Sequence, residues 1–337
     1  MIFSIVLFLS AIFFLSWLIL SPRPTKQPLI NTPPVSLVDH AKTANSCASC
    51  IRRLIDGVYV KPDDFNPPLA AVMIDNHPDA RPPAGLEKAS LVYEAEVEGY
   101  YTRLMAVYHS SSSVEKIGPV RSARPYFLDW ASELNAIYVH CGGSPEALVK
   151  IVQSNITDLN EFYNGQYFWR ATNRSAPHNI YISSQNLNNF LQSDKIFSSD
   201  LTSWKFKDDA PAVEATSSAI KINYRAPEFA VVWTYRRSSN DYLRSQNNQP
   251  VKTEDNQLIT AKNLIIQIVP AKVIDAVLRL KMNDVGSGQA TICLDGTCRA
   301  GEWQKTSATA RTKFSYSDGQ EVKFNAGPTW IEVVRPE

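Results

Sequence analysis

Residues 118–148 read GPVRSARPYFLDWASELNAIYVHCGGSPEAL, and this stretch decides the fold expected for the first half of the chain. Apolar residues recur at helical spacing from Phe127 to Leu134, and Pro125 stands in the first turn, where its missing N–H costs nothing. The run AIYVHC is typical of a buried strand. A Ser-Pro-Glu run at 144–146 then starts a second helix, with serine as the N-cap. Strands alternating with helices predict an α/β or α+β fold.

Strand patterns continue on both sides of this stretch. Before it, LAAVMIDN, ASLVYEAEVEG and YTRLMAVYHS each have the length and apolar content of a strand. In the second half, short strands such as FAVVWTYR, LIIQIV and TWIEVV recur between turn signals, which is typical of a sandwich or barrel. We therefore expect an α/β or α+β domain over residues 65–210, containing the ligand pocket, and a mostly-β domain over 215–337.

The first 64 residues read as a membrane attachment. Residues 1–21 begin with twenty residues that carry no charge, which is about the length of a membrane-spanning helix, and no small-residue cleavage site follows. We expect an uncleaved transmembrane anchor there, followed over residues 22–64 by a flexible linker rich in Pro, Ser and Thr. Arg23 and Lys26 follow the anchor, so the positive-inside rule alone would place the rest of the chain in the cytoplasm.

The cysteines favour the opposite side of the membrane. Asp295-Gly296 is a type I′ hairpin signal, which makes Cys293 and Cys298 a cross-strand pair about 4.5 Å apart and predicts a disulfide. Cys47 and Cys50 are a second candidate pair. Disulfides persist outside the cytoplasm, so we expect the folded part to be extracytoplasmic at the cell membrane.

Alternatives to disulfides were reduced cysteines, a redox centre and a metal site. No Cys or His spacing completes a metal site, so none is predicted. The remaining cysteine, Cys141, is expected to be a buried thiol. The formal net charge of +1, with both signs mixed along the chain, excludes nucleic-acid binding as the main activity.

Cationic and polar residues gather at predicted element ends. Arg121 and Arg124 precede one helix, and guanidinium groups suit phosphate or carboxylate. The Gly-Gly-Ser turn opens the next helix, where free amides and close backbone approach would favour an anion. We therefore expect an anion-binding pocket for a phosphorylated or carboxylated envelope ligand. The candidate ligand-binding residues are Arg121, Arg124, His140, Gly142, Gly143, Ser144, Asp75, Arg103, Arg170 and His178.

Each of these residues also has a structural interpretation. Ser144 alone is explained as a helix cap, and GGSP lacks the nucleophile elbow of a serine hydrolase. His140 at a strand end suits a hydrogen-bonded structural role, and either arginine could pair with a helix carboxylate. The pocket hypothesis rests on their convergence.

Two further functions remain open. One is a hydrolase or transferase acting on envelope glycan or phosphodiester, with His140 or His178 as general base and Asp75 or Glu94 as its partner. The other is a non-enzymatic scaffold that docks a wall-synthesis protein through strand edges or exposed aromatics. The sequence specifies no catalytic residue and no cofactor.

Several blocks resemble a known family. AVMIDNHPDARPPAGLEKASLVYEAEVEG, GPVRSARPYFLDWASELNAIYVHCGGSPEAL and APHN resemble the amino-terminal domain of the YerB-like family of bacterial membrane-attached envelope proteins, and VGSGQATICLDG and NAGPTWIEVV resemble its carboxy-terminal domain. The resemblance implies a two-domain extracytoplasmic protein, often a lipoprotein, with no established reaction. The chain departs from the family in its apparent transmembrane anchor, in Cys141 and in the Cys293/Cys298 pair.

Overall fold

The computed structural model describes residues 49–196 and 198–336. The expected anchor over 1–21, most of the expected linker and Cys47 lie outside the described residues. Cys50 is disulfide-bonded. Among the helices of the described part, none is long and apolar enough to cross a membrane.

Ordered structure begins before residue 65, which corrects the expected extent of the linker. Strand β1 (Ile51–Arg52) pairs with β2 (Tyr59–Val60), and a 3₁₀ helix, η2 (Pro62–Asp64), follows. Ile55 is 3% exposed in the core between these strands. Arg53 donates to both carboxylate oxygens of Asp56, at 3.0 and 2.8 Å. The short apolar run around an Asp-Gly turn therefore folds onto the domain.

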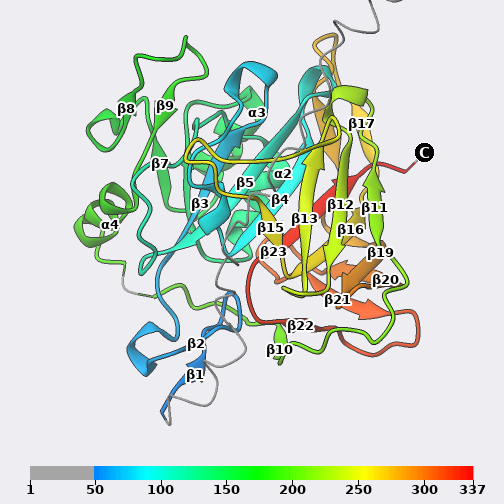
Figure 1. The fold of residues 1–337 in the computed structure, drawn as a ribbon. Coiled ribbons are helices and arrows are strands. Elements are labelled where there is room, and N and C mark those ends of the chain that lie inside the picture. The colour runs from blue at the N-terminus through cyan, green and yellow to red at the C-terminus, as the bar shows by residue number, and fades with distance from the viewer. Residues whose placement is uncertain (1–48, 197, 337) are drawn as a thin grey trace, which may run out of the picture. The chain divides into compact units, whose positions relative to one another are not determined.

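Strands from both halves of the chain pair in one ten-stranded sheet (Figure 1). The strands are β3 (Leu69–Asp75), β4 (Leu91–Glu96), β5 (Thr102–His109), β6 (Ile137–His140), β7 (Asp158–Asn160), β16 (Asn263–Ile268), β19 (Gly286–Leu294), β20 (Thr297–Lys305), β21 (Lys313–Tyr316) and β23 (Thr329–Val334). Their order is β21-β20-β19-β16-β23-β4-β5-β3-β6-β7. The last strand, β23, runs parallel to β16 on one side and to β4 on the other, so it joins the two halves.

Helices cover one face of this sheet. As expected, residues 125 onward form a helix, α2 (Pro125–Ser132), and Ser144 caps the next one, α3 (Pro145–Gln153), by accepting a hydrogen bond from the amide of Ala147 at 3.3 Å. Trp130 of α2 stacks on Tyr93 of β4 with ring centroids 4.9 Å apart. Burying side chains of this size contributes roughly 2–3 kcal/mol each, so α2 is fixed by packing.

A second sheet covers the other face. It consists of β11 (Ala219–Ile222), β12 (Val231–Arg236), β13 (Asp241–Gln246) and β14 (Gln249–Pro250), with β15 (Thr260–Ala261) also pairing with β13. Trp233 of β12 packs against Trp330 of β23 at 5.1 Å between rings. A third helix, α4 (Ser184–Ser193), contributes Leu187, Phe190 and Leu191 to the same core. The fold class is confirmed: a helix-containing first half precedes a mostly-β second half.

The remaining elements are short. The strand pairs are β8 (Trp169–Arg170) with β9 (Ile180–Tyr181), β10 (Lys205–Lys207) with β22 (Lys323–Asn325), and β17 (Ala271–Val273) with β18 (Leu280–Met282). The other 3₁₀ helices are η3 (Pro78–Ala80), η4 (Leu86–Lys88), η5 (Glu98–Tyr100), η6 (Gly165–Tyr167) and η7 (Pro227–Phe229).

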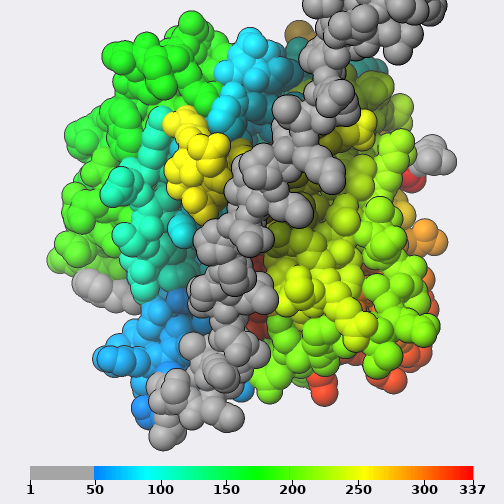
Figure 2. Space-filling view, in the orientation of Figure 1, coloured from blue at the N-terminus to red at the C-terminus, as the bar shows by residue number. Residues whose placement is uncertain are grey.

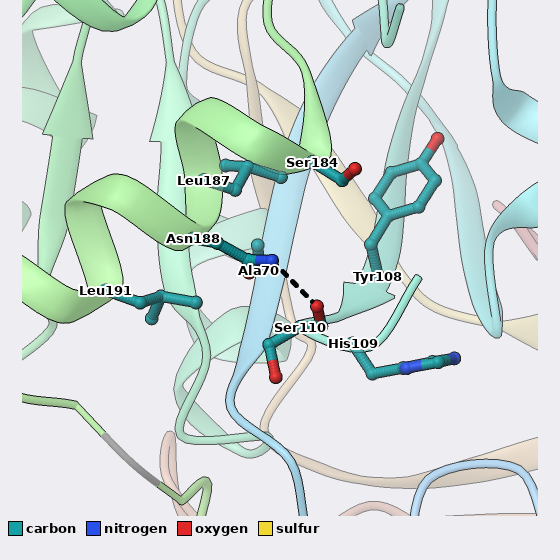
Figure 3. Close-up of a pocket in the computed structure, with 8 residues that line it drawn as sticks. All are labelled: Ala70, Tyr108, His109, Ser110, Ser184, Leu187, Asn188 and Leu191. Atoms are coloured by element: carbon teal, nitrogen blue, oxygen red, sulfur yellow. Dashed lines mark hydrogen bonds between the residues drawn. The ribbon is translucent and has the colours of Figure 1, made fainter. Parts of the chain in front are cut away.

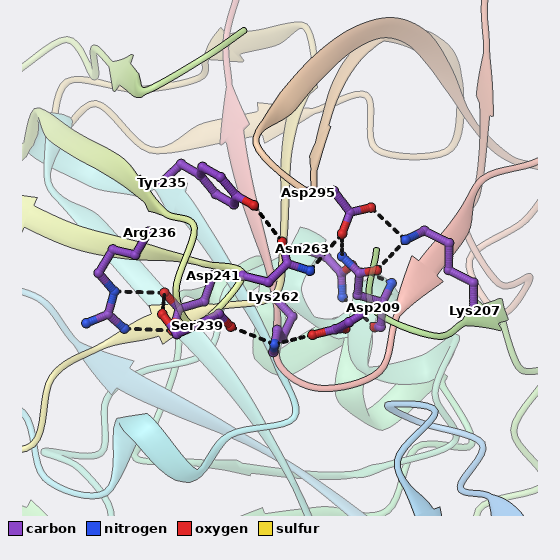
Figure 4. A network of polar contacts seen from close by, with 11 residues as sticks. Lys207, Asp209, Tyr235, Arg236, Ser239, Asp241, Lys262, Asn263 and Asp295 are labelled. Atoms are coloured by element: carbon purple, nitrogen blue, oxygen red, sulfur yellow. Dashed lines mark hydrogen bonds and ion pairs between the residues drawn. The ribbon is translucent and has the colours of Figure 1, made fainter. Parts of the chain in front are cut away.

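The predicted Cys293–Cys298 disulfide is confirmed. Cys293 and Cys298 are register partners across the β19–β20 hairpin, with Cα atoms 4.0 Å apart. Asp295 and Gly296 form the turn, with positive φ angles of 55° and 83°. Figure 4 shows how the turn is held: the Asp295 carboxylate accepts hydrogen bonds from Lys207 at 2.6 Å and from Asn240 at 2.8 Å.

A buried ion cluster ties the end of α2 to the second half. The carboxylate of Glu133 is fully buried and accepts hydrogen bonds from Tyr93 at 2.8 Å and from the fully buried Lys305 at 2.8 Å. Arg311 and Thr312 also donate to it. Burial opposes ionisation, but the charges of Arg311 and Lys305 outweigh it and hold the pKa of Glu133 below its usual value. Since α2 and these partners come from different halves, the cluster joins the two halves within one compact unit.

Candidate functional site

The end of strand β3 brings together three segments that are distant in the chain. Val120 bridges to Ile74 in β3 and donates its amide to the carbonyl of Ile180 at 2.7 Å. The segment around Val120 therefore lies between β3 and β9. This arrangement places Asp75, Arg121 and His178 side by side.

Asp75 is the centre of this group. Its side chain is 4% exposed, and Oδ2 lies 2.7 Å from Nδ1 of His178 and 2.9 Å from Nε of Arg121. Because an ionised carboxylate only accepts hydrogen bonds, Nδ1 of His178 is the donor in this contact, and Nε2 is the ring nitrogen left for another partner. The Asp75–His178 pair thus has the geometry that orients a histidine for proton transfer or for metal binding.

Arg121 has unused hydrogen-bonding capacity. Its side chain is 23% exposed, and it makes no side-chain hydrogen bond to any described residue, although its Nε is buried beside Asp75. Arg121 forms an ion pair with Asp75 through Nε, and its two terminal nitrogens have no partner among the described residues. The open donors of Arg121 suit the oxygen atoms of an anion.

Arg124 and Arg103 lie next to this group but are already paired. Arg124 forms a two-point ion pair with Glu98, in which its Nε donates at 2.7 Å. Arg103 is buried, and it donates to the Ser122 carbonyl at 2.9 Å. Burial and the charge of Arg124 lower the pKa of Arg103 to about 10. Burial opposes ionisation of Glu98, but the hydrogen bond from Arg124 and the charge of Arg103 prevail and lower its pKa to about 2.

His140 faces the interior and not the surface group. Its side chain is fully buried at the end of β6. Nδ1 lies 2.6 Å from the carbonyl of Gly142, and Nε2 contacts the Asp158 carboxylate. Both ring nitrogens are therefore engaged within the protein.

The Gly-Gly-Ser turn is occupied by backbone pairing. The amide of Gly142 donates to Asn160 at 3.0 Å, and that of Ser144 to the Ala123 carbonyl at 3.2 Å. Gly143 bridges to Ala123, which brings the two element ends together as backbones. These contacts correct the expectation of free amides at the start of α3.

Arg170 borders the group from strand β8. It donates to Asn179, the neighbour of His178, at 3.1 Å, and its side chain is 49% exposed. It also contacts Glu161, which accepts a hydrogen bond from Cys141 at 3.4 Å. Burial and Glu161 raise the pKa of the Cys141 thiol to about 12, so this cysteine is not a reactive thiolate.

Glu94 belongs to a separate, internal network. Its carboxylate is fully buried and accepts hydrogen bonds from Arg244 at 2.6 Å and from Asn76 at 3.0 Å. Nearby, burial and the charge of Glu94 raise the pKa of Glu332 to about 8. Between the two carboxylates considered as partners for a catalytic histidine, Asp75 is the one that contacts His178.

The loop Val251–Leu258 of the second half holds the loop that carries His178. Figure 2 shows this yellow segment lying against the cyan part of the first half. Within it, Glu254 accepts hydrogen bonds from Lys116 at 2.5 Å and from Tyr181 at 3.0 Å. It also lies 3.2 Å from Arg174, four residues before His178.

Two further residues complete the surface group: His77, a polar candidate at the end of the strand that contains Asp75, and Asp79, which was not among the expected site residues. His77 stacks on His178 with ring centroids 4.6 Å apart, and on Tyr101 at 5.1 Å. The Asp79 amide donates to Nδ1 of His77 at 3.1 Å. The signal that was available is their position directly after a buried strand that ends in Asp75.

Two pockets in the described part lie at the opposite end of β3. Figure 3 shows the smaller one, about 10 Å³, beside α4. A larger hollow of about 270 Å³ adjoins it. Neither of these two pockets is lined by Asp75, Arg121 or His178. The smaller pocket is lined by Ala70, Tyr108, His109, Ser110, Ser184, Leu187, Asn188 and Leu191.

Comparisons with known proteins match both halves of the chain. A family model described as "Protein of unknown function (DUF3048) N-terminal domain" matches residues 57–197, and the model of the DUF3048 C-terminal domain matches residues 220–331. The chain is 29% identical over 271 residues to a Bacillus subtilis (strain 168) protein named "Putative lipoprotein YerB", covering 78% of this chain and 80% of that protein. A crystal structure of YerB from Bacillus subtilis matches with a TM-score of 0.76 at 27% identity, covering 84% of this chain and 96% of that one.

Proposed function

The chain belongs to the DUF3048 family of proteins of unknown function, and on that premise we propose that it is a membrane-attached envelope protein that binds an anionic ligand through Arg121 and His178. The resemblance to the YerB-like family is thereby confirmed. The relative's name contains the word lipoprotein, which supports membrane attachment. The Cys293–Cys298 disulfide supports an extracytoplasmic location for the folded part.

The observation that carries the proposal is that Arg121 pairs with Asp75 through Nε alone, which leaves its two terminal nitrogens without a partner among the described residues. Three arginines, Arg103, Arg121 and Arg124, lie with the carboxylates of Asp75 and Glu98, and the exposed Asp79 carboxylate at the edge of the group balances the third positive charge. Arg103 and Arg124 are already paired with other groups of the protein, whereas the terminal nitrogens of Arg121 remain available to donate hydrogen bonds to a ligand. A phosphate or carboxylate oxygen would satisfy them.

The proposed site therefore differs from the one expected from sequence. Arg121 and His178 meet at the buried carboxylate of Asp75, and Arg103 contacts the neighbouring Ser122 carbonyl. The Gly-Gly-Ser turn pairs with the backbone of Ala123, two residues after Arg121, and His140 contacts the Gly142 carbonyl of this turn, while Arg170 lies at the border. Ligands of the proposed class are phosphorylated or carboxylated wall precursors.

The test is a binding titration of the purified full chain in detergent, with chelator present. Polyprenyl phosphate is compared with the neutral polyprenol, and a wall peptide with a terminal carboxylate is compared with its amide. Arg121→Gln should weaken binding of the charged member roughly 10- to 100-fold, as expected for losing a charge-assisted contact. The matched control is Arg299→Gln, which removes another partly exposed, ion-paired arginine from β20. Equal affinity of wild type and Arg121→Gln would exclude the proposal.

A second candidate function, favoured by the 2.7 Å contact between His178 and Asp75, is hydrolysis or group transfer on an envelope glycan or phosphodiester. In this function Nε2 of His178 would accept a proton from the attacking group. His178→Gln should then reduce turnover far more than its loss of ligand affinity accounts for, whereas Arg121→Gln should mainly weaken binding. If envelope cross-linking instead captures a stoichiometric protein partner that Arg121→Gln does not release, the scaffold function replaces both proposals.

A further inference from the structure

Three potential metal ligands converge on the surface beside Arg121. His77, Asp79 and His178 each offer one ligand atom, and these atoms lie within 4.8 Å of one another. His77 and Asp79 sit two residues apart at the start of η3, so one tight turn presents both. Oδ2 of Asp79 lies 3.6 Å from Nδ1 of His77, close to the separation of two ligands on one small ion.

The buried carboxylate of Asp75 prepares His178 for this role. A metal-bound histidine commonly donates its other ring N–H to a carboxylate, which fixes the tautomer and the ring orientation. Asp75 makes this contact at 2.7 Å and is itself 4% exposed. It also accepts the backbone amide of His77 at 3.0 Å through its other oxygen. One buried carboxylate therefore positions both histidines.

The local charge permits a cation despite the nearby arginines. Arg121 is paired with Asp75, and Arg174 lies 3.2 Å from Glu254. The Asp79 carboxylate adds a negative charge directly at the group, and its side chain is 75% exposed. An ion held here would keep positions open toward solvent and toward Arg121.

From this arrangement we propose that His77, Asp79 and His178 bind one divalent transition-metal ion of the zinc class. Two imidazole nitrogens and one carboxylate oxygen are a ligand set that zinc accepts at sites with an open position, whereas magnesium and calcium prefer oxygen ligands alone. In binding, the ion takes the lone pair of His178 Nε2. The rings of His77 and His178 are stacked with 20° between their planes, so the partly exposed ring of His77 must turn out of the stack to present Nδ1 to the same ion, in place of the amide hydrogen of Asp79. The open position would accept water or an oxygen of an anion held by Arg121.

The experiment is a titration of the metal-free full chain with Zn²⁺ alone, followed by isothermal calorimetry. Co²⁺ is used in parallel, because its visible absorption reports the ligand geometry. Wild type should bind one ion, with cobalt bands of low-symmetry, nitrogen- and oxygen-ligated coordination. Asp79→Ala, which removes an exposed side chain without disturbing the fold, and His178→Ala should each weaken binding at least about tenfold. Asp75→Asn should weaken it roughly 10- to 100-fold through the lost orientation of His178.

The matched control is His109→Ala, at the other end of the same strand pair, where His109 is the register partner of Leu69. It should leave zinc binding unchanged. Absence of stoichiometric binding to wild type, or binding that survives the His77→Ala/His178→Ala double change, would overturn the proposal. Because zinc binding is measured without an anion and anion binding is measured with chelator, failure of either proposal is distinguishable from failure of the other.

Discussion

Nδ1 of His178 lies 2.7 Å from Oδ2 of Asp75, although 103 positions separate the two residues in the chain. The contact depends on β3, on the crossing segment at Val120 and on the loop that Glu254 holds from the second half. The proposed anion binding and the proposed metal binding both depend on this contact. Its loss should therefore affect both.

We predict that Asp75→Asn reverses the tautomer of His178. In the wild type the carboxylate requires the hydrogen on Nδ1, whereas the asparagine amide can donate to Nδ1 and move the hydrogen to Nε2. Nitrogen-15 spectra of the imidazole in mildly alkaline solution would show the change. Asp79→Asn should leave the His178 signals in place. Finding the hydrogen already on Nε2 in the wild type would contradict the assigned roles.

We predict that the Arg124–Glu98 pair stabilises the fold in a pH-dependent way. The pKa of Glu98 is lowered to about 2, from about 4.3 in an unfolded chain. Its contribution is thus complete above the unfolded pKa and is lost as the pH falls through the folded one. A double-mutant cycle of Arg124→Gln and Glu98→Gln should give a coupling of about 1–3 kcal/mol near neutral pH, shrinking toward pH 2. A coupling that does not change over this range would refute the assignment.

We predict that Glu133→Gln destabilises the whole body. The substitution leaves Lys305 and Arg311 buried beside a neutral amide, and breaking a buried ion cluster costs roughly 3–5 kcal/mol. Because the cluster joins α2 to the second half, fluorescence and circular dichroism should report one shared, lowered urea midpoint. Unfolding of the second half alone would contradict the single cooperative body.

We predict that the Cys293→Ala/Cys298→Ala double change costs about 2 kcal/mol of unfolding free energy. This is the chain-entropy value for so short a loop, whose cysteines are five residues apart. The hydrogen bonds to Asp295 should keep the hairpin folded. Urea unfolding with and without reductant measures the effect: reductant should destabilise the wild type more than the variant, which retains the disulfide of Cys50. Loss of all folded structure in the variant would show that the hairpin depends on the disulfide.

Local patterns were sufficient for part of the fold. The Asp-Gly turn fixes the register of Cys293 and Cys298 within a few residues, and Ser144 with Pro145 starts α3 for purely local reasons. The position of β23 was not predictable, because TWIEVV has the same apolar content whether it lies within a separate β domain or next to β4. Its pairing with β4 depends on contacts across more than half the chain.

The site shows the same limit. Arg121 lies beside Asp75 and His178, but which side chains remain free depends on tertiary partners. Arg124 pairs with Glu98, and the Ser144 amide donates to the Ala123 carbonyl. The ring of His140 is buried and contacts the Gly142 carbonyl. The spacing of residues in the sequence does not indicate any of these partners.

The most direct test of anion binding by Arg121 is to follow its guanidinium NMR signal during titration with inorganic pyrophosphate in the presence of chelator. We expect the NMR signals of the Arg121 Nη hydrogens to shift, and these hydrogens to exchange more slowly, as the anion binds. The signals of Arg299 should not change. Saturable binding that leaves the Arg121 signals unchanged, or no binding at all, would contradict anion binding by Arg121.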